Sequence, residues 1–154
     1  MTGKLRIAVG SDHAGFALKE KVRVYLVNRG YEVEDHGTGS AESVDYPDYA
    51  EKVAARVAAQ EVNFGVVVCG TGIGVAISAN KIPGIRAAPC SDTLTARMAR
   101  EHNDANVLTL GGRVVDESTA RKILDVWLAT PFAGGRHQRR VDKIAAIDQR
   151  HHSA

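Results

Sequence analysis

Cysteine is scarce in this sequence, and its scarcity excludes two classes of protein. The chain holds two cysteines, Cys69 and Cys90, which have neither the number nor the spacing of a disulfide framework or a zinc site. Long apolar runs are also missing, so no segment approaches membrane-spanning length. The first residues lead directly into a predicted strand, without a signal-like segment. We therefore expect a soluble cytoplasmic protein with free thiols.

An excess of charge of one sign is absent as well. The formal net charge of +2 is too small to indicate binding to nucleic acid, and the basic residues are spread along the chain except near the C-terminus. Internal repeats and low-complexity segments are not found. With 154 residues, the chain fits a single domain, 1–154, that is large enough to bury a core.

What the sequence does contain is a regular alternation of strand-like and helix-like segments. Strands are predicted over 5–10, 31–35, 66–68, 85–88 and 107–110, and helices over 16–29, 47–59, 75–81, 91–100 and 117–128. This alternation predicts an α/β fold of the Rossmann-like type, a three-layer αβα sandwich around a five-stranded parallel sheet. The expected strand order is flavodoxin-like, 2-1-3-4-5, with right-handed crossovers.

The segment after Pro131 differs from the rest. Val141, Ile144 and Ile147 form the apolar stripe of a C-terminal helix over about 136–149, and no strand follows it. A helix with an apolar stripe and nothing left to cover in its own chain is expected to pack on a partner subunit.

Chemistry concentrates in Cys69-Gly-Thr-Gly-Ile-Gly74, which follows the buried strand 66–68. Unpaired N–H groups and a positive helix dipole at such a turn suit an anion. Cys69 is either a base or nucleophile, or a small inert residue at a strand end. The glycines either form an anion site or only permit tight helix–sheet packing. Their weak likeness to a dinucleotide fingerprint is discounted, because no acidic residue closes the next strand.

A second polar turn, Ser11-Asp12-His13, follows the first predicted strand. The predicted topology changes direction between strands 1 and 3, and ligands of such folds bind there, beyond the carboxyl ends of the strands. We therefore expect Asp12 and His13 beside Cys69. The two residues are an acid/base pair or an anion contact, or Asp12 simply caps the following helix.

His102 and Asn103 lie just past the fourth predicted helix. A histidine at such a position often has no role beyond a favourable interaction with the negative end of the helix dipole. Both residues precede strand 5, so they lie at the edge of the sheet opposite Cys69, roughly 15 Å away along a strand. Arg136 and Arg140 share one face of the C-terminal helix. They either clamp a phosphate or form a solvated basic face.

Taken together, these motifs resemble the B-type ribose-5-phosphate isomerases, whose family also holds galactose-6-phosphate and allose-6-phosphate isomerases. The resemblance rests on Gly10-Ser-Asp-His-Ala-Gly15, Asp45-Tyr46-Pro47, Cys69-Gly-Thr-Gly-Ile-Gly74, Ala79-Asn-Lys81, Gly84-Ile-Arg-Ala87, His102-Asn-Asp-Ala-Asn-Val107 and Gly134-Gly-Arg-His137 with Arg140. A branch of the family uses a glutamate directly after the third glycine. Here that residue is Val75, so the chain looks like the cysteine type.

The resemblance implies an aldose-ketose isomerase of the non-oxidative pentose phosphate pathway. It would interconvert D-ribose 5-phosphate and D-ribulose 5-phosphate through a cis-enediolate, without a metal or another cofactor. Cys69 is implied as the base that moves the proton between C2 and C1, and Thr71 as a shuttle for protons among the enediol oxygens. The implied anion hole consists of Gly70, Gly72, Ile73 and Gly74.

The resemblance also implies residues that handle the rest of the sugar. His102, helped by Asp12, would open the furanose ring, and Asn103 would hold a hydroxyl. The implied phosphate ligands are His13, Arg136 and Arg140, with Arg113 a weaker candidate, and Tyr46 would line the pocket.

The position of His102 bears on assembly. If His102 opens the ring, it must do so in a partner's site, because it lies at the edge opposite Cys69. We therefore expect a homodimer with shared active sites, or a tetramer built from it, and no nucleic-acid or membrane partner. Two alternatives stay open. The protein could isomerise a hexose 6-phosphate such as allose 6-phosphate, or a rare sugar, or it could be a sugar-phosphate sensor without catalytic activity.

Overall fold

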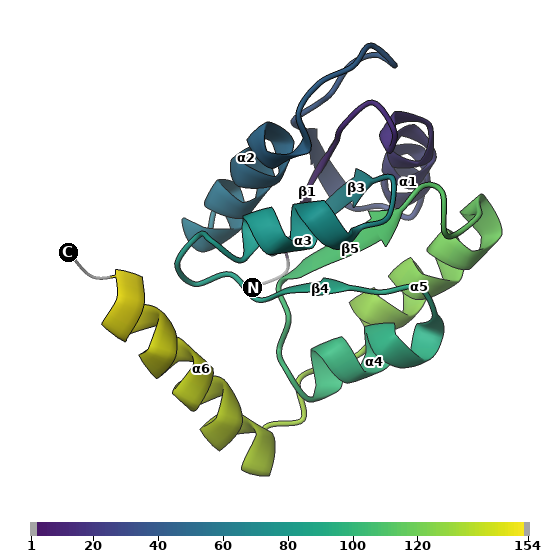
Figure 1. Cartoon of the computed structure of the whole chain (residues 1–154). Helices are drawn as coiled ribbons and strands as arrows, with labels where there is room; N and C mark the ends of the chain where they lie inside the picture. Colours follow the sequence, from purple (N-terminus) through teal and green to yellow (C-terminus); the bar gives the residue numbers. More distant parts are fainter. Residues whose placement is uncertain (1–2, 153–154) are drawn as a thin grey trace.

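A five-stranded parallel sheet with helices on both faces forms the body of the molecule, as the computed structural model of the chain shows (Figure 1). The structure describes residues 3–152. The strands are β1 (Arg6–Ser11), β2 (Glu32–Asp35), β3 (Phe64–Cys69), β4 (Ala87–Pro89) and β5 (Val107–Gly111). The helices are α1 (Phe16–Asn28), α2 (Tyr46–Ala58), α3 (Ile73–Ala79), α4 (Thr93–Glu101), α5 (Glu117–Ala129) and α6 (Arg136–His152).

The strand order is β2-β1-β3-β5-β4, so the predicted order 2-1-3-4-5 is wrong for the last two strands. β5 is buried along its whole length and pairs with β3 from Gly65↔Val107 to Cys69↔Gly111. β4 has three residues and ends at Pro89, which has no N–H to donate, so it suits the edge of the sheet. The change of direction between β1 and β3 is unaffected, and the predicted class of fold is confirmed.

Two hydrophobic clusters, one on each face of the sheet, form the core. On one face α1, α4 and α5 cover the strands, with Leu26, Ile123 and Trp127 among the most deeply buried side chains. On the other face α2 and α3 contribute Val53 and Val75. The strands read as nearly continuous runs of apolar residues because both faces of the sheet are covered.

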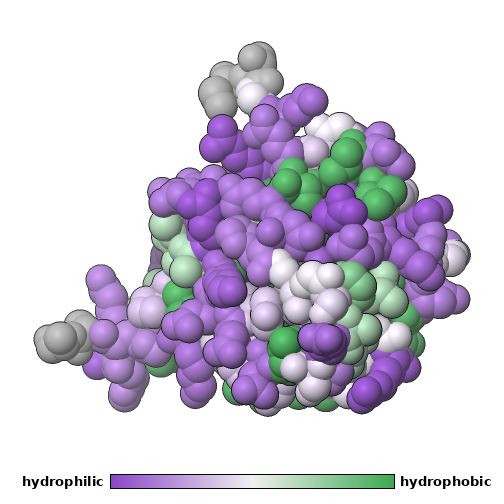
Figure 2. Space-filling view, turned by 90° about the horizontal axis from the view of Figure 1, so that it is seen from above, coloured by the Kyte–Doolittle hydropathy of each residue, from purple (hydrophilic) through white to green (hydrophobic). Residues whose placement is uncertain are grey.

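Helix α6 takes no part in either cluster. It lies beside the sheet and projects from the body (Figures 1 and 2). Val141 is its buried residue, whereas Ile144 and Ile147 are 43% and 50% exposed. Near its C-terminal end, Asp148 Oδ2 accepts a hydrogen bond of 2.7 Å from the Gly84 N–H. The helix therefore keeps most of its apolar stripe in the open.

The rest of the surface shown in Figure 2 is dominated by hydrophilic residues, with separate hydrophobic patches. Within residues 3–152, no helix combines the length and the apolar character that a membrane span requires.

Candidate functional site

Three turns meet at the carboxyl edge of the sheet, after β1, β3 and β5. The Asp12 N–H donates to Val68 O at 3.3 Å, which joins the first turn to the end of β3. The Gly112 N–H donates to Cys69 O at 2.8 Å, which joins β3 to the turn after β5. A Cβ at Gly15 would lie 2.3 Å from Val68 O, so glycine is what lets the first turn approach this closely.

Cys69 is 5% exposed, at the end of β3, and the glycine-rich turn bends around it. The Gly72 N–H donates to Cys69 Sγ at 3.2 Å, and the Ile73 N–H donates to Thr71 Oγ1 at 3.2 Å. Backbone donors therefore converge on the thiol and on the hydroxyl that the sequence singled out. A donor at the sulfur suits a base that carries negative charge during part of a reaction.

Gly72 is the N-cap of α3, with a φ of 81°. This left-handed conformation suits glycine, and a Cβ at this position would lie 2.9 Å from the carbonyl carbon of Leu110. Thr109 Oγ1, in β5, donates to Gly72 O at 2.7 Å. This contact ties the turn to β5 at the residue whose N–H donates to Cys69 Sγ.

Asp12 and His13 lie in the first turn, at the same edge as Cys69. Asp12 is 6% exposed, and its Oδ1 accepts the Gly15 N–H at 2.9 Å. The N-cap of α1 is Gly15 and not Asp12, so the carboxylate fixes the turn before the helix. His13 Nδ1 lies 3.1 Å from the Val44 N–H and accepts from it. Because Nδ1 accepts this hydrogen bond, the neutral imidazole carries its proton on Nε2, where it can be donated to a ligand.

Tyr46 and Arg113 close the same edge from two sides. A Cβ at Gly74 would lie 2.5 Å from Cε1 of Tyr46, so the phenol ring packs directly over the start of α3. A Cβ at Gly70 would lie 3.0 Å from Nη1 of Arg113, so this guanidinium lies over the turn. Both side chains therefore lie over the glycine-rich turn that follows Cys69.

His102 and Asn103 lie elsewhere. His102 caps the C-terminal end of α4, and β5 begins only at Val107, so both residues lie at the amino edge of the sheet. The imidazole of His102 stacks on that of His137, with 4.2 Å between ring centroids and 12° between planes. Within this chain, His102 belongs to the same group as the start of α6.

Arg136, His137 and Arg140 form the first turns of α6. The pKa of His137 is lowered, first because the ring is partly removed from water, and then because His102 and the two arginines oppose a further positive charge, while Glu101 acts in the opposite direction. The phosphate-binding arginines proposed from the sequence therefore belong to one basic group with His102, which is separate from Cys69.

His137 was not among the candidate site residues predicted from the sequence. Its neighbours in the motif, Arg136 and Arg140, were chosen because of their spacing, and nothing in that spacing predicts a stack with His102. The signal that could have identified His137 was its position inside the motif Gly134-Gly-Arg-His137, directly after Arg136.

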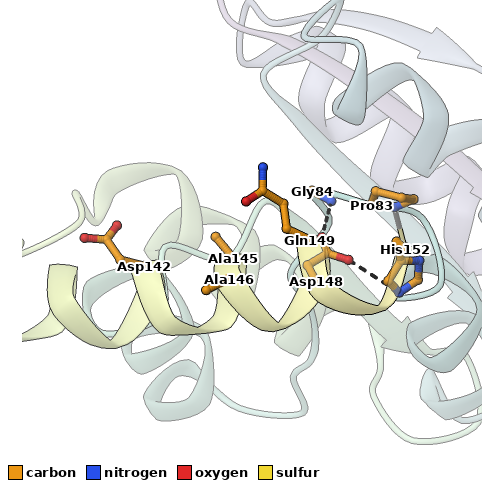
Figure 3. Close-up of a pocket in the computed structure, with 8 residues that line it drawn as sticks. All are labelled: Pro83, Gly84, Asp142, Ala145, Ala146, Asp148, Gln149 and His152. Atoms are coloured by element: carbon orange, nitrogen blue, oxygen red, sulfur yellow. Dashed lines mark hydrogen bonds and ion pairs between the residues drawn. The ribbon is translucent and has the colours of Figure 1, made fainter. Parts of the chain in front are cut away.

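A cavity of about 640 Å³ lies between α6 and the turn at Pro83 and Gly84 (Figure 3). Asp148 and His152 line it together with small residues of α6 such as Ala145. It does not reach the Cys69 turn. No group of three or more histidine, cysteine, aspartate or glutamate side chains within residues 3–152 is arranged to hold a metal ion.

The chain is similar to known isomerases along almost its whole length. It is 52% identical over 145 residues to Escherichia coli ribose-5-phosphate isomerase B, covering 94% of this chain and 97% of that one. The solved structure of the Clostridium thermocellum ribose-5-phosphate isomerase B superposes with a TM-score of 0.94 at 53% identity, covering 95% of this chain and 99% of that one.

The Mycoplasma genitalium ribose-5-phosphate isomerase B, solved with bound ribulose-5-phosphate, has a TM-score of 0.91 at 41% identity, covering 94% and 97% of the two chains. The family model described as ribose/galactose isomerase matches residues 7–144. The chain therefore belongs to the ribose/galactose isomerase family.

Proposed function

We propose that this protein interconverts D-ribose 5-phosphate and D-ribulose 5-phosphate, as an aldose-ketose isomerase of the pentose phosphate pathway. The observation that carries this proposal is the 52% identity to Escherichia coli ribose-5-phosphate isomerase B along 94% of the chain. The glycine-rich turn around Cys69 supports it. The hexose-phosphate and sensor alternatives are not favoured, since the relatives and solved structures reported above are named for ribose 5-phosphate.

Cys69 is the base in this proposal. Its thiolate takes the proton from C2 of the open-chain aldose and returns it to C1, and negative charge develops on the enediolate oxygens between the two steps. Backbone N–H groups of Gly70 to Gly74 lie where they can stabilise that charge. Thr71 Oγ1, adjacent to the thiol in the turn, moves protons between the two oxygens.

His13 and Arg113 are the phosphate ligands that the Cys69 edge itself offers. Neutral His13 donates through Nε2, because Nδ1 accepts the Val44 N–H. Arg113 lies over Gly70 and presents a guanidinium, which suits a phosphate. Tyr46 limits the pocket beside Gly74.

The remaining groups come from a second copy of the chain. His102 and Asn103 lie at the amino edge of the sheet, so a single chain does not bring them to its own thiol. The stack of His102 on His137 supports one further step, because it joins the ring-opening histidine to Arg136 and Arg140. We infer that one subunit supplies all of these residues, and Asp12 assists the ring opening from the subunit that holds Cys69.

Exposed isoleucines support this assembly. Ile73 and Ile77 on α3 are 57% and 58% exposed, directly beside the Cys69 turn, and Ile144 and Ile147 on α6 are exposed as well. Burial of such side chains against a second copy stabilises a dimer. The open groove beside α6 in Figure 3 is consistent with a helix whose packing partner is another subunit.

Turnover by the purified protein tests the proposed function. Ribose 5-phosphate and allose 6-phosphate are supplied separately, with EDTA present. We expect isomerisation of the pentose phosphate, unaffected by EDTA, with a kcat/KM well above that for the hexose phosphate. Absence of pentose turnover would refute the proposal.

A further inference from the structure

Two arginines, Arg86 and Arg100, bind the segment that carries His102 and Asn103. Arg100 belongs to the last turn of α4, and Arg86 lies just before β4. Besides a carboxylate, their guanidinium groups bind the backbone. They donate to the carbonyl groups of residues 103, 104 and 105, which follow His102 directly.

Arg100 holds the segment from the core side. It is 8% exposed, and its guanidinium lies 4.8 Å from the centroid of the Phe64 ring and 5.8 Å from that of Trp127. Nη1 donates to Ala105 O at 2.6 Å and to Asp104 Oδ1 at 3.0 Å.

The burial of Arg100 is not fully compensated. Its Nε–H is buried and has no hydrogen-bond partner within residues 3–152. An unpaired buried donor costs stability. What the burial of Arg100 does provide is a pair of hydrogen bonds from Nη1, to the carbonyl of Ala105 and to the carboxylate of Asp104, just after α4.

Arg86 binds the same segment from the residue before β4. Its Nε donates to Asn103 O at 3.2 Å and to Asp104 O at 3.0 Å. Its own backbone is fixed, because the Arg86 N–H donates to Asn106 Oδ1 at 2.8 Å and Arg86 O accepts the Asn106 N–H at 3.0 Å. Because the Arg86 backbone is fixed, its side chain can hold the 103–104 backbone in one position.

Asp104 links the two arginines. Oδ1 bonds to Arg100 as described, and Oδ2 lies 3.6 Å from Arg86 Nη2. Its φ is 47°, a left-handed conformation that is disfavoured for a residue with a side chain. Aspartate adopts this region more readily than most residues, and the contacts with Arg86 and Arg100 hold it there.

We propose that Arg86 and Arg100 are positioning residues of the isomerase reaction, which hold the 103–105 backbone so that His102 and Asn103 project correctly into the partner's site. This inference rests on the proposed function, since it takes His102 as the group that opens the ring. Neither arginine touches the sugar, and both act through the backbone.

Arg86→Ala is the first test, because Arg86 is partly exposed and its removal leaves the core intact. Misplacement of a catalytic group by about 1 Å can cost on the order of 10² in rate, so kcat should fall by that order while KM changes less than about threefold. Free guanidinium should restore part of kcat, and Arg86→Lys should not. Arg97→Ala serves as the control and should match the wild type, because Arg97 is an exposed arginine of α4, the helix that ends before His102.

A double-mutant cycle separates positioning from a general structural role. When His102 and Asn103 are both already replaced by alanine, adding Arg86→Ala should lower the residual activity by less than about threefold, because neither functional side chain is left to position. An equal loss in both backgrounds would overturn the inference. Arg100→Lys should behave like Arg86→Ala in this cycle, provided that its thermal unfolding stays cooperative.

The imidazole signals of His102 and His137 give a readout without turnover. The stacked rings should show ring-current shifts in the NMR spectrum of the wild type, and Arg86→Ala should weaken them while Arg97→Ala leaves them unchanged. If the wild type has no isomerase activity, the proposed function fails. If the wild type is active and Arg86→Ala alters neither kcat nor these signals, this inference fails.

Discussion

His102 and His137 stack face to face, 4.2 Å apart between ring centroids, although the two residues are 35 positions apart in the chain. This contact joins the end of α4 to the start of α6, which otherwise projects from the body. It places the histidine proposed for ring opening and the arginines proposed for phosphate binding in one group, at the edge of the sheet opposite Cys69. The candidate site residues of one chain therefore lie in two separate places.

The His137 ring should make the start of α6 sensitive to acid. Its pKa is lowered from the ordinary 6.5, because the ring is partly removed from water and faces His102, Arg136 and Arg140. The unfolded chain binds this proton more readily, so the folded state loses stability as the pH falls below 6.5 and regains it above. An NMR titration should give His137 a midpoint below 6.5. A midpoint at or above this value would contradict the stacked, charge-opposed environment.

Cys69 should be indispensable for turnover. Cys69→Ala should abolish isomerisation while the affinity for the sugar phosphate stays within a few-fold, because the thiol acts mainly in the transition state. Stopped-flow turnover and calorimetric binding measure the two quantities separately. A variant that keeps about a tenth or more of the wild-type kcat would show that another group is the base.

The two cysteines should differ in their reaction with iodoacetamide. Cys90 is 4% exposed, and burial raises the pKa of its thiol to about 11, so it stays a protonated and unreactive thiol. Cys69 has the backbone donor of Gly72 at its sulfur. Peptide mass spectrometry should find the label on Cys69, with inactivation that the substrate prevents. Labelling of Cys90 at an equal rate would count against a special reactivity of Cys69.

The conformation of Gly72 should matter for activity beyond its effect on folding. Gly72→Ala places a Cβ 2.9 Å from the backbone of Leu110 and needs a φ of 81°, so the turn must shift and the donor to Cys69 is lost. The Gly72 N–H also belongs to the proposed anion hole, and the loss of one such donor costs on the order of 10² in kcat. Gly30→Ala is the matched control, because Gly30 also has a positive φ of 92° but has nothing within 4 Å.

Both glycine variants should lose roughly 1–2 kcal/mol of stability in denaturant titrations, since both force alanine into the left-handed region. Gly72→Ala should lose more than Gly30→Ala, because its Cβ also meets the backbone of Leu110. Only Gly72→Ala should lose turnover. Equal kcat values in the two variants would mean that the turn does not assist the reaction.

The arginines of α6 should act on substrate affinity. Replacing Arg136 or Arg140 with alanine removes a charge-assisted contact and should raise KM by a factor that corresponds to roughly 1.5–3 kcal/mol. Gln138→Ala is the control, because Gln138 is two positions from each of these arginines and therefore lies on another face of α6. An unchanged KM in both variants would leave Arg113 and His13 as the phosphate ligands.

The sequence predicted the part of the fold and site that depends on local pattern. Alternating segments indicated the parallel sheet, and the turns after β1 and β3 were expected side by side, which the Asp12 and Val68 contact confirms. The positions of β4 and β5 were interchanged, because strand order depends on long-range pairing, and only the weakness of β4 and its Pro89 hinted at an edge strand.

Contacts between distant segments were equally invisible in the sequence. The stack of His137 on His102 joins a helix end to a helix start, and the Val44 N–H that fixes the His13 tautomer comes from a loop with no pattern of its own. Arg86 appeared only inside a family motif. Its hold on the backbone after His102 depends on how the start of β4 lies against the start of β5.

Mixing two inactive variants tests the shared site most directly. Cys69→Ala and His102→Ala subunits are combined and allowed to exchange, with exchange verified by mass spectrometry of differently labelled chains. Each mixed dimer then carries one intact site, so an equal mixture should recover about a quarter of the wild-type activity. If exchange is complete and no activity returns, His102 does not act in the partner's site and the shared-site account is wrong.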